Sequence, residues 1–276
     1  MELPPGLSSW SGGPGGPVSS PCRLHLGSHV PLRYTDCTFG YRAGVPVLDS
    51  LTFEFPPGNT VLLGPNGAGK STLLSLGASV LSPSSGTVRL GSADSVRRKD
   101  RREFRRRVGW LPQRISPVPG LTVREQAAYA GWLKGMSRRR AWDRSADALD
   151  RVRLTQLASR RSHELSGGQL RRLGIAQAIV HRAEVVLLDE PTAGLDPEQR
   201  RVFRELLADL SDRVHFVVST HQTEDLADIY HSVVVFDQGR VAYEGNTHGF
   251  LAHAPGDVPG DRRAETAYRS LVRGEV

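Results

Sequence analysis

The chain has 276 residues, and 38% of them are hydrophobic, which suits one large domain or a core with a smaller lobe. Apolar runs such as Val185–Leu188 and Val233–Phe236 are much shorter than the roughly 18 residues of a bilayer span, so we expect no transmembrane helix. The formal net charge of +7 is compatible with nucleic acid or an anionic membrane surface as a neighbour.

Residues 1–30 form a compositional zone of their own. Gly, Pro and Ser dominate the stretch Ser8–Ser20, which predicts a flexible tail. No Lys or Arg precedes Arg23, so the pattern is not that of a secretory signal peptide. Cys22 and Cys37 have no metal-binding spacing and are interpreted as two reduced thiols.

From about Leu32, short apolar runs alternate with helical patterns. A helix is predicted from Lys70, and Asp196 followed by Pro197 marks the start of another. The alternation predicts an α/β core with a mainly parallel sheet whose strands are buried on both faces. The predicted strands are Thr60–Leu63, Val108–Leu111, Val185–Asp189 and His215–Thr220.

The segment from about Leu121 to Val180 interrupts this alternation. It contains several helical patterns and no convincing strand. Leu170, Leu173 and Ala176 recur at the spacing of one helix face. We therefore predict a helical lobe inserted into the core.

A glycine-rich loop follows the first of these strands and precedes a helix. Gly64–Ser71 matches the pattern G-x-x-x-x-G-K-[ST] at every required position. Gly64, Gly67 and Gly69 are expected to let the backbone turn tightly at positive φ, so that amides point at phosphate oxygens. Lys70 is expected on the β- and γ-phosphates and Ser71 on Mg²⁺. The predicted phosphate-binding residues are Gly64, Pro65, Asn66, Gly67, Ala68, Gly69, Lys70, Ser71 and Thr72.

Two carboxylates end the apolar strand Val185–Asp189. Two charges at a buried strand end cost free energy unless a cation compensates for them or a reaction uses them. Asp189 is predicted to hold Mg²⁺, and Glu190 is predicted to be the general base for an attacking water.

Residues 165–169 read LSGGQ and predict a second anion-binding helix start. The residues expected to contact phosphate there are Ser166, Gly167, Gly168 and Gln169. One ATP already has a phosphate cradle in this chain, so the second cradle calls for the end of a second ATP.

Together these motifs resemble the ATP-binding cassette (ABC) family over about Leu32 to Glu244. The phosphate loop is similar to its Walker A motif, LSGGQ to its signature and VVLLDEP to its Walker B strand. Gln113, Asp196 and His221 resemble the glutamine loop, the D-loop and the switch histidine, in family order. The resemblance implies a P-loop NTPase (RecA-like) core, an N-terminal antiparallel β part and an inserted helical lobe.

The resemblance also implies roles for these residues. Gln113 is expected to contact Mg²⁺ and to sense the ATP state for the helical lobe, and His221 is expected on the γ-phosphate. Asp196 is expected at the seam of a dimer in which each chain's signature completes the ATP site of the other. Tyr41 resembles the aromatic residue that stacks on adenine, with Phe39 as the competing candidate.

The implied protein is an ATPase subunit that uses ATP and Mg²⁺, pairs with a second nucleotide-binding domain and drives a separate integral membrane permease. Its expected location is the cytoplasmic face of the cell membrane. The expected domains are a tail at 1–30, a nucleotide-binding domain at 31–246 with its lobe at about 114–180, and a C-terminal helical tail at 247–276. The segments PGLTVREQAAYAGWLKG and AYRSLVRGE are similar to exporter-type subunits, so export of an unidentified substrate is predicted.

A soluble ATP-gated clamp on nucleic acid or the ribosome is the alternative function. Its support is two Arg-rich runs, Arg97–Arg107 and Arg138–Arg140, which lack the interleaved aromatic residues of a single-strand-binding surface. We interpret both runs as solvated surface, with closeness to anionic lipid headgroups as the second interpretation. No specific nucleic acid is expected as a partner. A P-loop kinase or GTPase is excluded, because LSGGQ has no role there.

Overall fold

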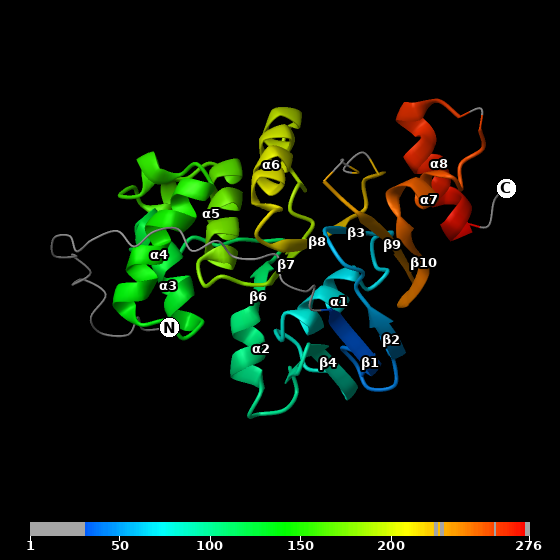
Figure 1. Cartoon of the computed structure of the whole chain (residues 1–276), viewed down its shortest axis with the longest axis horizontal. Coiled ribbons are helices and arrows are strands. Elements are labelled where there is room, and N and C mark those ends of the chain that lie inside the picture. The colour runs from blue at the N-terminus through cyan, green and yellow to red at the C-terminus, as the bar shows by residue number, and fades with distance from the viewer. Residues whose placement is uncertain (1–30, 224–225, 227–228, 257, 274–276) are drawn as a thin grey trace. The chain divides into compact units, whose positions relative to one another are not determined.

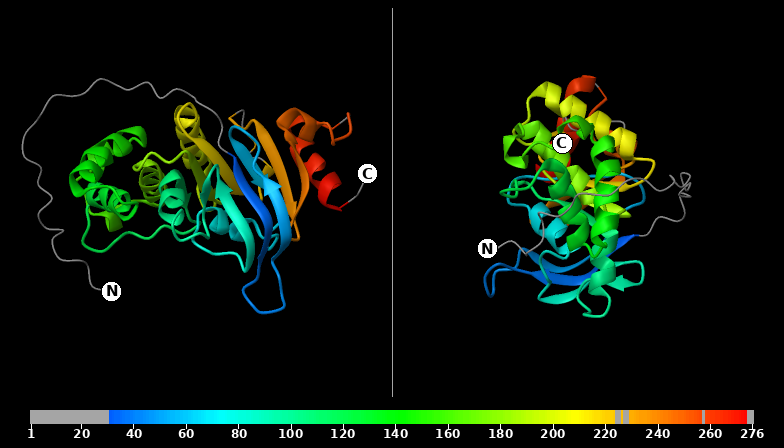
Figure 2. Two further views of the ribbon diagram at one scale, coloured as in Figure 1. Left: turned by 60° about the horizontal axis from the view of Figure 1, so that its bottom comes forward. Right: turned by 90° about the vertical axis from the view of Figure 1, so that its left-hand side faces the viewer.

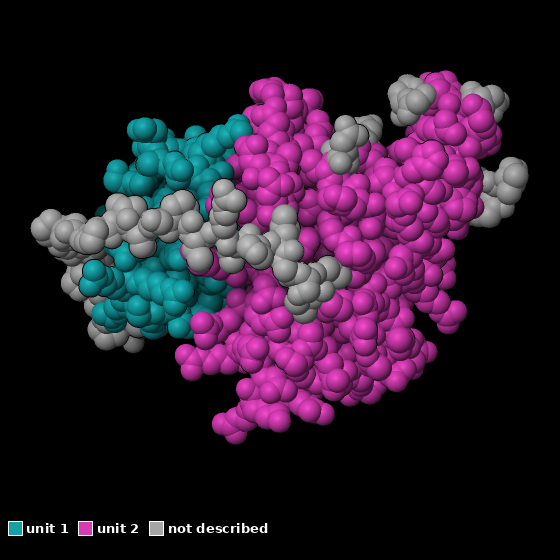
Figure 3. Space-filling view, in the orientation of Figure 1, with its two compact units in different colours: residues 1–27, 116–181 teal, residues 28–115, 182–276 magenta. Residues whose placement is uncertain are grey.

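The computed structural model describes residues 31–223, 226, 229–256 and 258–273. The chain divides into two compact units, one containing Ser116–His181 and the other containing Ser28–Ile115 with Arg182–Val276 (Figure 3). The predicted tail at 1–30, which includes Cys22, lies outside the described residues, as do residues 274–276. Within the described residues, no helix has the length and apolar character needed to span a bilayer.

A six-stranded sheet is the centre of the larger unit (Figure 1). Its order is β10-β9-β3-β8-β7-β6; β9, β3, β8, β7 and β6 are parallel, and β10 pairs antiparallel with β9. The inner strands β3 and β7 are buried along their whole length and are mostly apolar, as expected of strands covered on both faces. The strands are β3 (Thr60–Leu63), β6 (Val108–Leu111), β7 (Val185–Asp189), β8 (His215–Thr220), β9 (Ser232–Asp237) and β10 (Arg240–Asn246).

A four-stranded antiparallel sheet lies in the same unit, in the order β2-β1-β4-β5. β1 and β2 form a long ribbon closed by a loop at one end (Figure 2, left). Leu32 and Tyr34 are buried on alternate positions of β1, the period expected of a strand with one covered face. The strands are β1 (Leu32–Phe39), β2 (Leu48–Glu54), β4 (Ser85–Leu90) and β5 (Ala93–Asp94).

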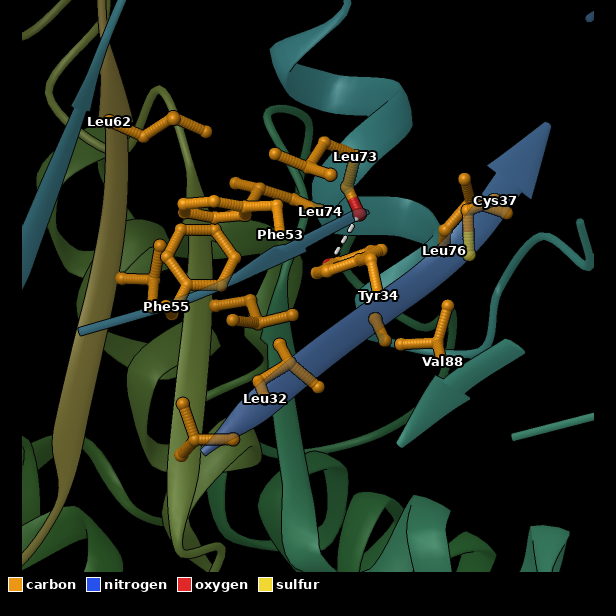
Figure 4. Close-up of a cluster of buried hydrophobic side chains, with 14 of the residues drawn as sticks. Leu32, Tyr34, Cys37, Phe53, Phe55, Leu62, Leu73, Leu74, Leu76 and Val88 are labelled. Atoms are coloured by element: carbon orange, nitrogen blue, oxygen red, sulfur yellow. Dashed lines mark hydrogen bonds between the residues drawn. The ribbon is translucent and has the colours of Figure 1, made fainter. Parts of the chain in front are cut away.

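The main hydrophobic core joins this sheet to helix α1 (Lys70–Gly77) and to strands of the six-stranded sheet (Figure 4). Tyr34 is fully buried, and its hydroxyl donates a hydrogen bond to the carbonyl of Leu73 at 2.9 Å. Gly77 faces the same ring: a Cβ there would lie 2.3 Å from Tyr34 Oη and 2.9 Å from Leu187 Cδ1. The absence of a side chain at Gly77 is therefore what lets the helix approach β1 and β7 this closely.

In the described part of the larger unit there are four further helices. α2 (Arg101–Arg107) precedes β6, and α6 (Pro197–Leu210) precedes β8. α7 (Thr247–Leu251) and α8 (Gly260–Arg273) follow β10 and pack against it (Figure 1). Cys37 is a buried free thiol on β1.

The smaller unit contains helices only, in its described part. α3 (Val123–Leu133) packs against α4 (Arg138–Arg151) and α5 (Gly167–Ile179). Two 3-10 turns, η2 (Thr155–Leu157) and η3 (Ser162–Glu164), connect α4 to α5. Hydroxyl side chains cap all three helix starts: Thr122, Ser137 and Ser166 each accept a hydrogen bond from an amide of the first turn.

The predicted fold class is confirmed. The chain has an α/β core with a mainly parallel sheet, an N-terminal antiparallel β part and an inserted helical unit. The sequence placed the lobe at about 114–180, and the unit in the structure spans Ser116–His181.

Candidate active site

The C-terminal ends of four neighbouring parallel strands lie along one edge of the six-stranded sheet. In sheet order these strands are β3, β8, β7 and β6. The phosphate loop follows β3, His221 follows β8, Glu190 follows β7, and Gln113 lies two residues beyond β6. In open α/β sheets ligands bind at this edge. The strand order therefore gathers segments that are far apart in the sequence into one site.

The phosphate loop has the backbone conformation that its glycines permit. Gly67 has φ 86° and Gly69 has φ 101°, both in the left-handed region. Gly64 does not have positive φ, which corrects the sequence interpretation. It is needed for another reason, because a Cβ there would lie 2.1 Å from the carbonyl oxygen of Phe236. α1 begins directly after the loop, and the amides of a first helical turn have no partners within the helix.

Lys70 is buried at the foot of the loop, with 5% of its side chain exposed. Its Nζ donates hydrogen bonds to the carbonyls of Gly64 at 2.7 Å and Pro65 at 3.0 Å. Burial lowers the pKa of Lys70, and the nearby carboxylates of Glu190 and Asp189 oppose that shift. The ammonium group is thus held by neutral carbonyls in the loop, where an anionic ligand can take their place.

Asp189 is buried at the end of β7 and accepts two hydroxyl hydrogen bonds at the same oxygen. Ser71 Oγ donates to Asp189 Oδ1 at 2.9 Å, and Ser219 Oγ donates to it at 2.7 Å. The sequence analysis did not single out Ser219. The signal that identifies it is strand pairing: Ser219 on β8 lies opposite Asp189 on β7 in the parallel register.

Glu190 has an unusual backbone conformation immediately after Asp189. Its φ is 43°, a left-handed value that costs a non-glycine residue about 1–3 kcal/mol. The Glu190 amide donates to both the carbonyl oxygen of Ser219 at 3.2 Å and its Oγ at 2.9 Å. These bonds hold the turn that redirects the Glu190 side chain.

The carboxylate of Glu190 contacts three other predicted site residues. Gln113 Nε2 donates to Oε2 at 3.1 Å, and His221 Nδ1 lies 3.1 Å from Oε1. Lys70 Nζ lies 3.9 Å from the same Oε1. Only 13% of the Glu190 side chain is exposed. An acid, an amide, an imidazole and an ammonium group therefore converge beside the phosphate loop.

Tyr41 lies beside the phosphate loop and is 67% exposed. Its hydroxyl is 3.2 Å from Thr72 Oγ1, at the start of α1. Its ring meets Phe39 edge-on, with the ring centroids 5.1 Å apart. An exposed aromatic face next to the phosphate loop is suited to stacking on a base, and Phe39 supports the ring from one edge.

The LSGGQ segment belongs to the smaller unit and starts α5. Ser166 and Gln169 form a capping box: Gln169 N donates to Ser166 Oγ at 3.3 Å, and Ser166 N donates to Gln169 Oε1 at 3.0 Å. Ser166 and Gly167 are exposed, and a Cβ at Gly167 would have no atom within 4 Å. Packing against the described residues therefore does not explain the glycine at position 167.

Asp196 is exposed and caps α6. Its carboxylate accepts a hydrogen bond from the amide of Gln199 at 2.8 Å, and Pro197 occupies the first helical position. The structure thus gives Asp196 a capping role, which leaves its expected place at a dimer seam as a prediction.

The residues predicted for Mg²⁺ fit that ion in type. Ser71 and Asp189 present a hydroxyl and a carboxylate oxygen, which a hard cation prefers. In the described part of the chain, no three His, Cys, Asp or Glu side chains form a metal-binding group. Mg²⁺ commonly binds through one or two protein oxygens together with substrate phosphates, so a small oxygen set beside a phosphate loop is sufficient.

Comparison with known proteins agrees with this geometry. The family described as ABC transporter matches residues 48–193. The "Cobalt import ATP-binding protein CbiO" of Rhodobacter capsulatus is 42% identical over 219 residues, 78% of each chain. The "Nod factor export ATP-binding protein I" of Paraburkholderia xenovorans is 38% identical over 208 residues, 75% of this chain and 68% of that protein. A solved "Dimeric structure of a post-hydrolysis state of the ATP-binding cassette MJ0796 bound to ADP and Pi" has a TM-score of 0.68 and 25% identity, covering 78% of this chain and 98% of that one.

A P-loop ATPase core with this motif order defines an ATP-binding cassette. The chain belongs to the ABC transporter family. It is an ATP-binding and ATP-hydrolysing subunit of an ABC transporter, and these matches do not favour the soluble clamp.

Proposed function

We propose that this chain is one half of a paired ATPase that drives a separate membrane permease from the cytoplasmic face of the membrane. The observation that carries the proposal is the contact of the Glu190 carboxylate with Gln113, His221 and Lys70 beside the phosphate loop. The matched relatives named for cobalt import and Nod factor export support the link to transport.

Binding of ATP begins at the loop. The amides of residues Gly64–Ser71 and the first turn of α1 take the phosphate oxygens, and Thr72 follows them at the helix start. Lys70 exchanges its carbonyl partners for the β- and γ-phosphates, since an ionised acceptor makes a stronger hydrogen bond than a neutral one. Tyr41 stacks on the adenine ring with its exposed face.

Ser71, Asp189 and Gln113 are the residues that would hold Mg²⁺. A bound Mg²⁺ would neutralise phosphate charge during phosphoryl transfer. Ser219 contributes by fixing the orientation of Asp189, because its hydroxyl occupies one lone pair of Oδ1.

Hydrolysis then uses the carboxylate next to the metal-binding aspartate. Glu190 accepts a proton from the water whose oxygen attacks the γ-phosphorus, and ADP leaves as the bond to its β-phosphate oxygen breaks. The Nδ1 atom of His221 lies near Glu190 Oε1 in the structure. The other ring nitrogen turns towards the γ-phosphate and stabilises the charge there. A change in the contact of Gln113 with Glu190 is transmitted along the chain to Ser116, where the helical unit begins.

A second chain supplies the other side of the phosphate. Among the described residues, no atom lies within 4 Å of a Cβ placed on Gly167, so packing does not require glycine there. The exposed tip at Ser166–Gln169 is therefore suited to close approach by a ligand held on the partner chain. Transport direction stays a prediction: export follows from the sequence, and relatives of both directions match.

The test is Glu190→Gln in the purified subunit. We expect ATP binding to persist, ATP hydrolysis to fall by at least 100-fold and ATP-bound dimers to accumulate, measured by phosphate release and light scattering. Glu244→Gln is the matched control, because Glu244 is an exposed carboxylate of β10 outside the site. Turnover of Glu190→Gln near that of the control would remove Glu190 from the role of base.

A further inference from the structure

Within the Arg-rich run Arg97–Arg107, six arginines form two rows, one bonded to other residues of the chain and one without a partner among the described residues. A hydrogen bond from the Arg101 amide to the carbonyl oxygen of Arg97 extends the helical path of α2 back to Arg97. Residues four apart along this path lie on one face. Arg97, Arg101 and Arg105 form the bonded row, and Arg98, Arg102 and Arg106 form the free row.

Every arginine of the bonded row is used within the chain. Arg97 forms an ion pair with Asp94 at 3.8 Å. Arg101 donates to the carbonyl oxygens of Ser95 and Val96, and Arg105 donates to the Ser79 hydroxyl and carbonyl oxygens. These contacts, together with the fully buried Phe104, hold α2 against the rest of the larger unit.

The free row has no such use. Arg98, Arg102 and Arg106 are exposed, and their side chains form no hydrogen bond or ion pair with any described residue. Lys99, which is also exposed and unpaired within the described chain, adds a fourth cation beside them. Like charges four residues apart repel and destabilise a helix. The row is thus unfavourable for folding, and an external anion bound to it would offset the repulsion.

We propose that the free row binds anionic lipid headgroups at the membrane surface. Guanidinium groups match phosphate oxygens in geometry, and a polybasic segment is attracted to an anionic leaflet. The inference rests on the proposed location of the subunit beside a membrane permease. It gives the subunit its own contact with lipid, in addition to the permease.

Nucleic acid is the less suitable partner. A surface that binds single strands combines cations with aromatic side chains on which bases stack. Phe104 is the one aromatic residue of the run Arg97–Arg107, and its side chain is fully buried in the core. The free row therefore offers charge without a stacking surface.

The experiment measures binding of the full-length subunit to vesicles of phosphatidylcholine, with and without 30% phosphatidylglycerol. The variant is Arg98→Gln with Arg102→Gln and Arg106→Gln. Each basic residue near an anionic surface contributes roughly fivefold to binding, so we expect about a 100-fold lower partition coefficient. Raising the salt should weaken binding of the unaltered chain, because salt screens exposed charge. ATP hydrolysis should remain unchanged, which separates this inference from the proposed function.

The matched control is Arg138→Gln with Arg139→Gln and Arg140→Gln. It removes the same three charges from exposed, consecutive positions on α4, which do not form a row on one helix face. We expect the control to lose less than fivefold. An equal loss in both variants, binding without phosphatidylglycerol, or no loss in the first variant would overturn the proposal. Loss of duplex nucleic-acid binding with vesicle binding intact would assign the row to nucleic acid instead.

Discussion

The hydroxyl of Ser219 donates a hydrogen bond to Asp189 Oδ1 at 2.7 Å and accepts one from the amide of Glu190 at 2.9 Å. Ser219 is fully buried on β8, so water does not substitute for either bond. One side chain thereby orients the carboxylate proposed for Mg²⁺ and supports the left-handed turn at the proposed general base. Ser219 is a positioning residue, because it acts through Asp189 and Glu190.

Ser219→Ala should lower ATP hydrolysis by about tenfold and raise the Mg²⁺ concentration needed for half-maximal rate. A hydrogen bond to a charged group is worth about 1.5–3 kcal/mol, and the variant leaves Asp189 with one hydroxyl partner in place of two. The measurement is phosphate release as a function of Mg²⁺ at saturating ATP.

Thr60→Val is the matched control for that substitution. Thr60 is also a fully buried hydroxyl residue of the six-stranded sheet, but its Oγ1 has no hydrogen-bond partner among the described residues. Its replacement should leave the Mg²⁺ dependence unchanged and should not lower stability. An unaltered Mg²⁺ requirement in Ser219→Ala would show that Ser219 has only a packing role.

Ser166→Arg should preserve ATP binding by the single chain and abolish turnover. The phosphate loop is elsewhere in the sequence, whereas Ser166 and Gly167 form the exposed tip that we propose faces the partner's ATP. Nucleotide binding by fluorescence and turnover by phosphate release separate the two effects.

Ser137→Arg provides the comparison for Ser166→Arg. Ser137 is likewise an exposed N-cap, on α4, so its loss costs a similar cap energy of about 1 kcal/mol. We expect Ser137→Arg to keep most of its turnover. Equal turnover in both variants would contradict the paired arrangement.

Gly77→Ala should destabilise the larger unit by about 1–3 kcal/mol, because the new Cβ would overlap Tyr34 Oη at 2.3 Å. Urea unfolding measures the loss. Tyr34→Phe in the same chain should recover part of it by removing the overlapping oxygen. Gly256→Ala is the control, since a Cβ there has no atom within 4 Å; similar losses at both positions would contradict the packing argument.

Tyr41→Ala should raise the KM for ATP by roughly tenfold with little change in kcat. Base stacking contributes about 1–3 kcal/mol, and the exposed ring contributes little to the core. Tyr41→Phe keeps the aromatic face and loses only the contact with Thr72, so it should bind ATP nearly normally. If Phe39→Ala raises KM and Tyr41→Ala does not, Phe39 is the stacking residue.

Local sequence patterns predicted much of the fold and of the candidate site. The phosphate loop, LSGGQ and the apolar strand before Asp189 are each encoded within a few consecutive residues, and strand and helix preferences act over the same range. The sequence therefore determined the fold class, the family and the strand ends that bear the site. It also identified the cap of α6 from Asp196 and Pro197.

Only the tertiary structure decided which of these segments meet. The contacts of Ser219 with Asp189 and of Gly77 with Tyr34 join residues 30 and more positions apart, so they follow from strand order and packing. The correction at Gly64 has the same origin, because its constraint is the carbonyl of distant Phe236. The division of the arginines on α2 into bonded and free rows likewise depends on partners such as Ser79 that no local pattern specifies. Contacts of this kind form when segments far apart in the sequence come together and close long loops. The pattern of neighbouring residues does not specify which segments meet.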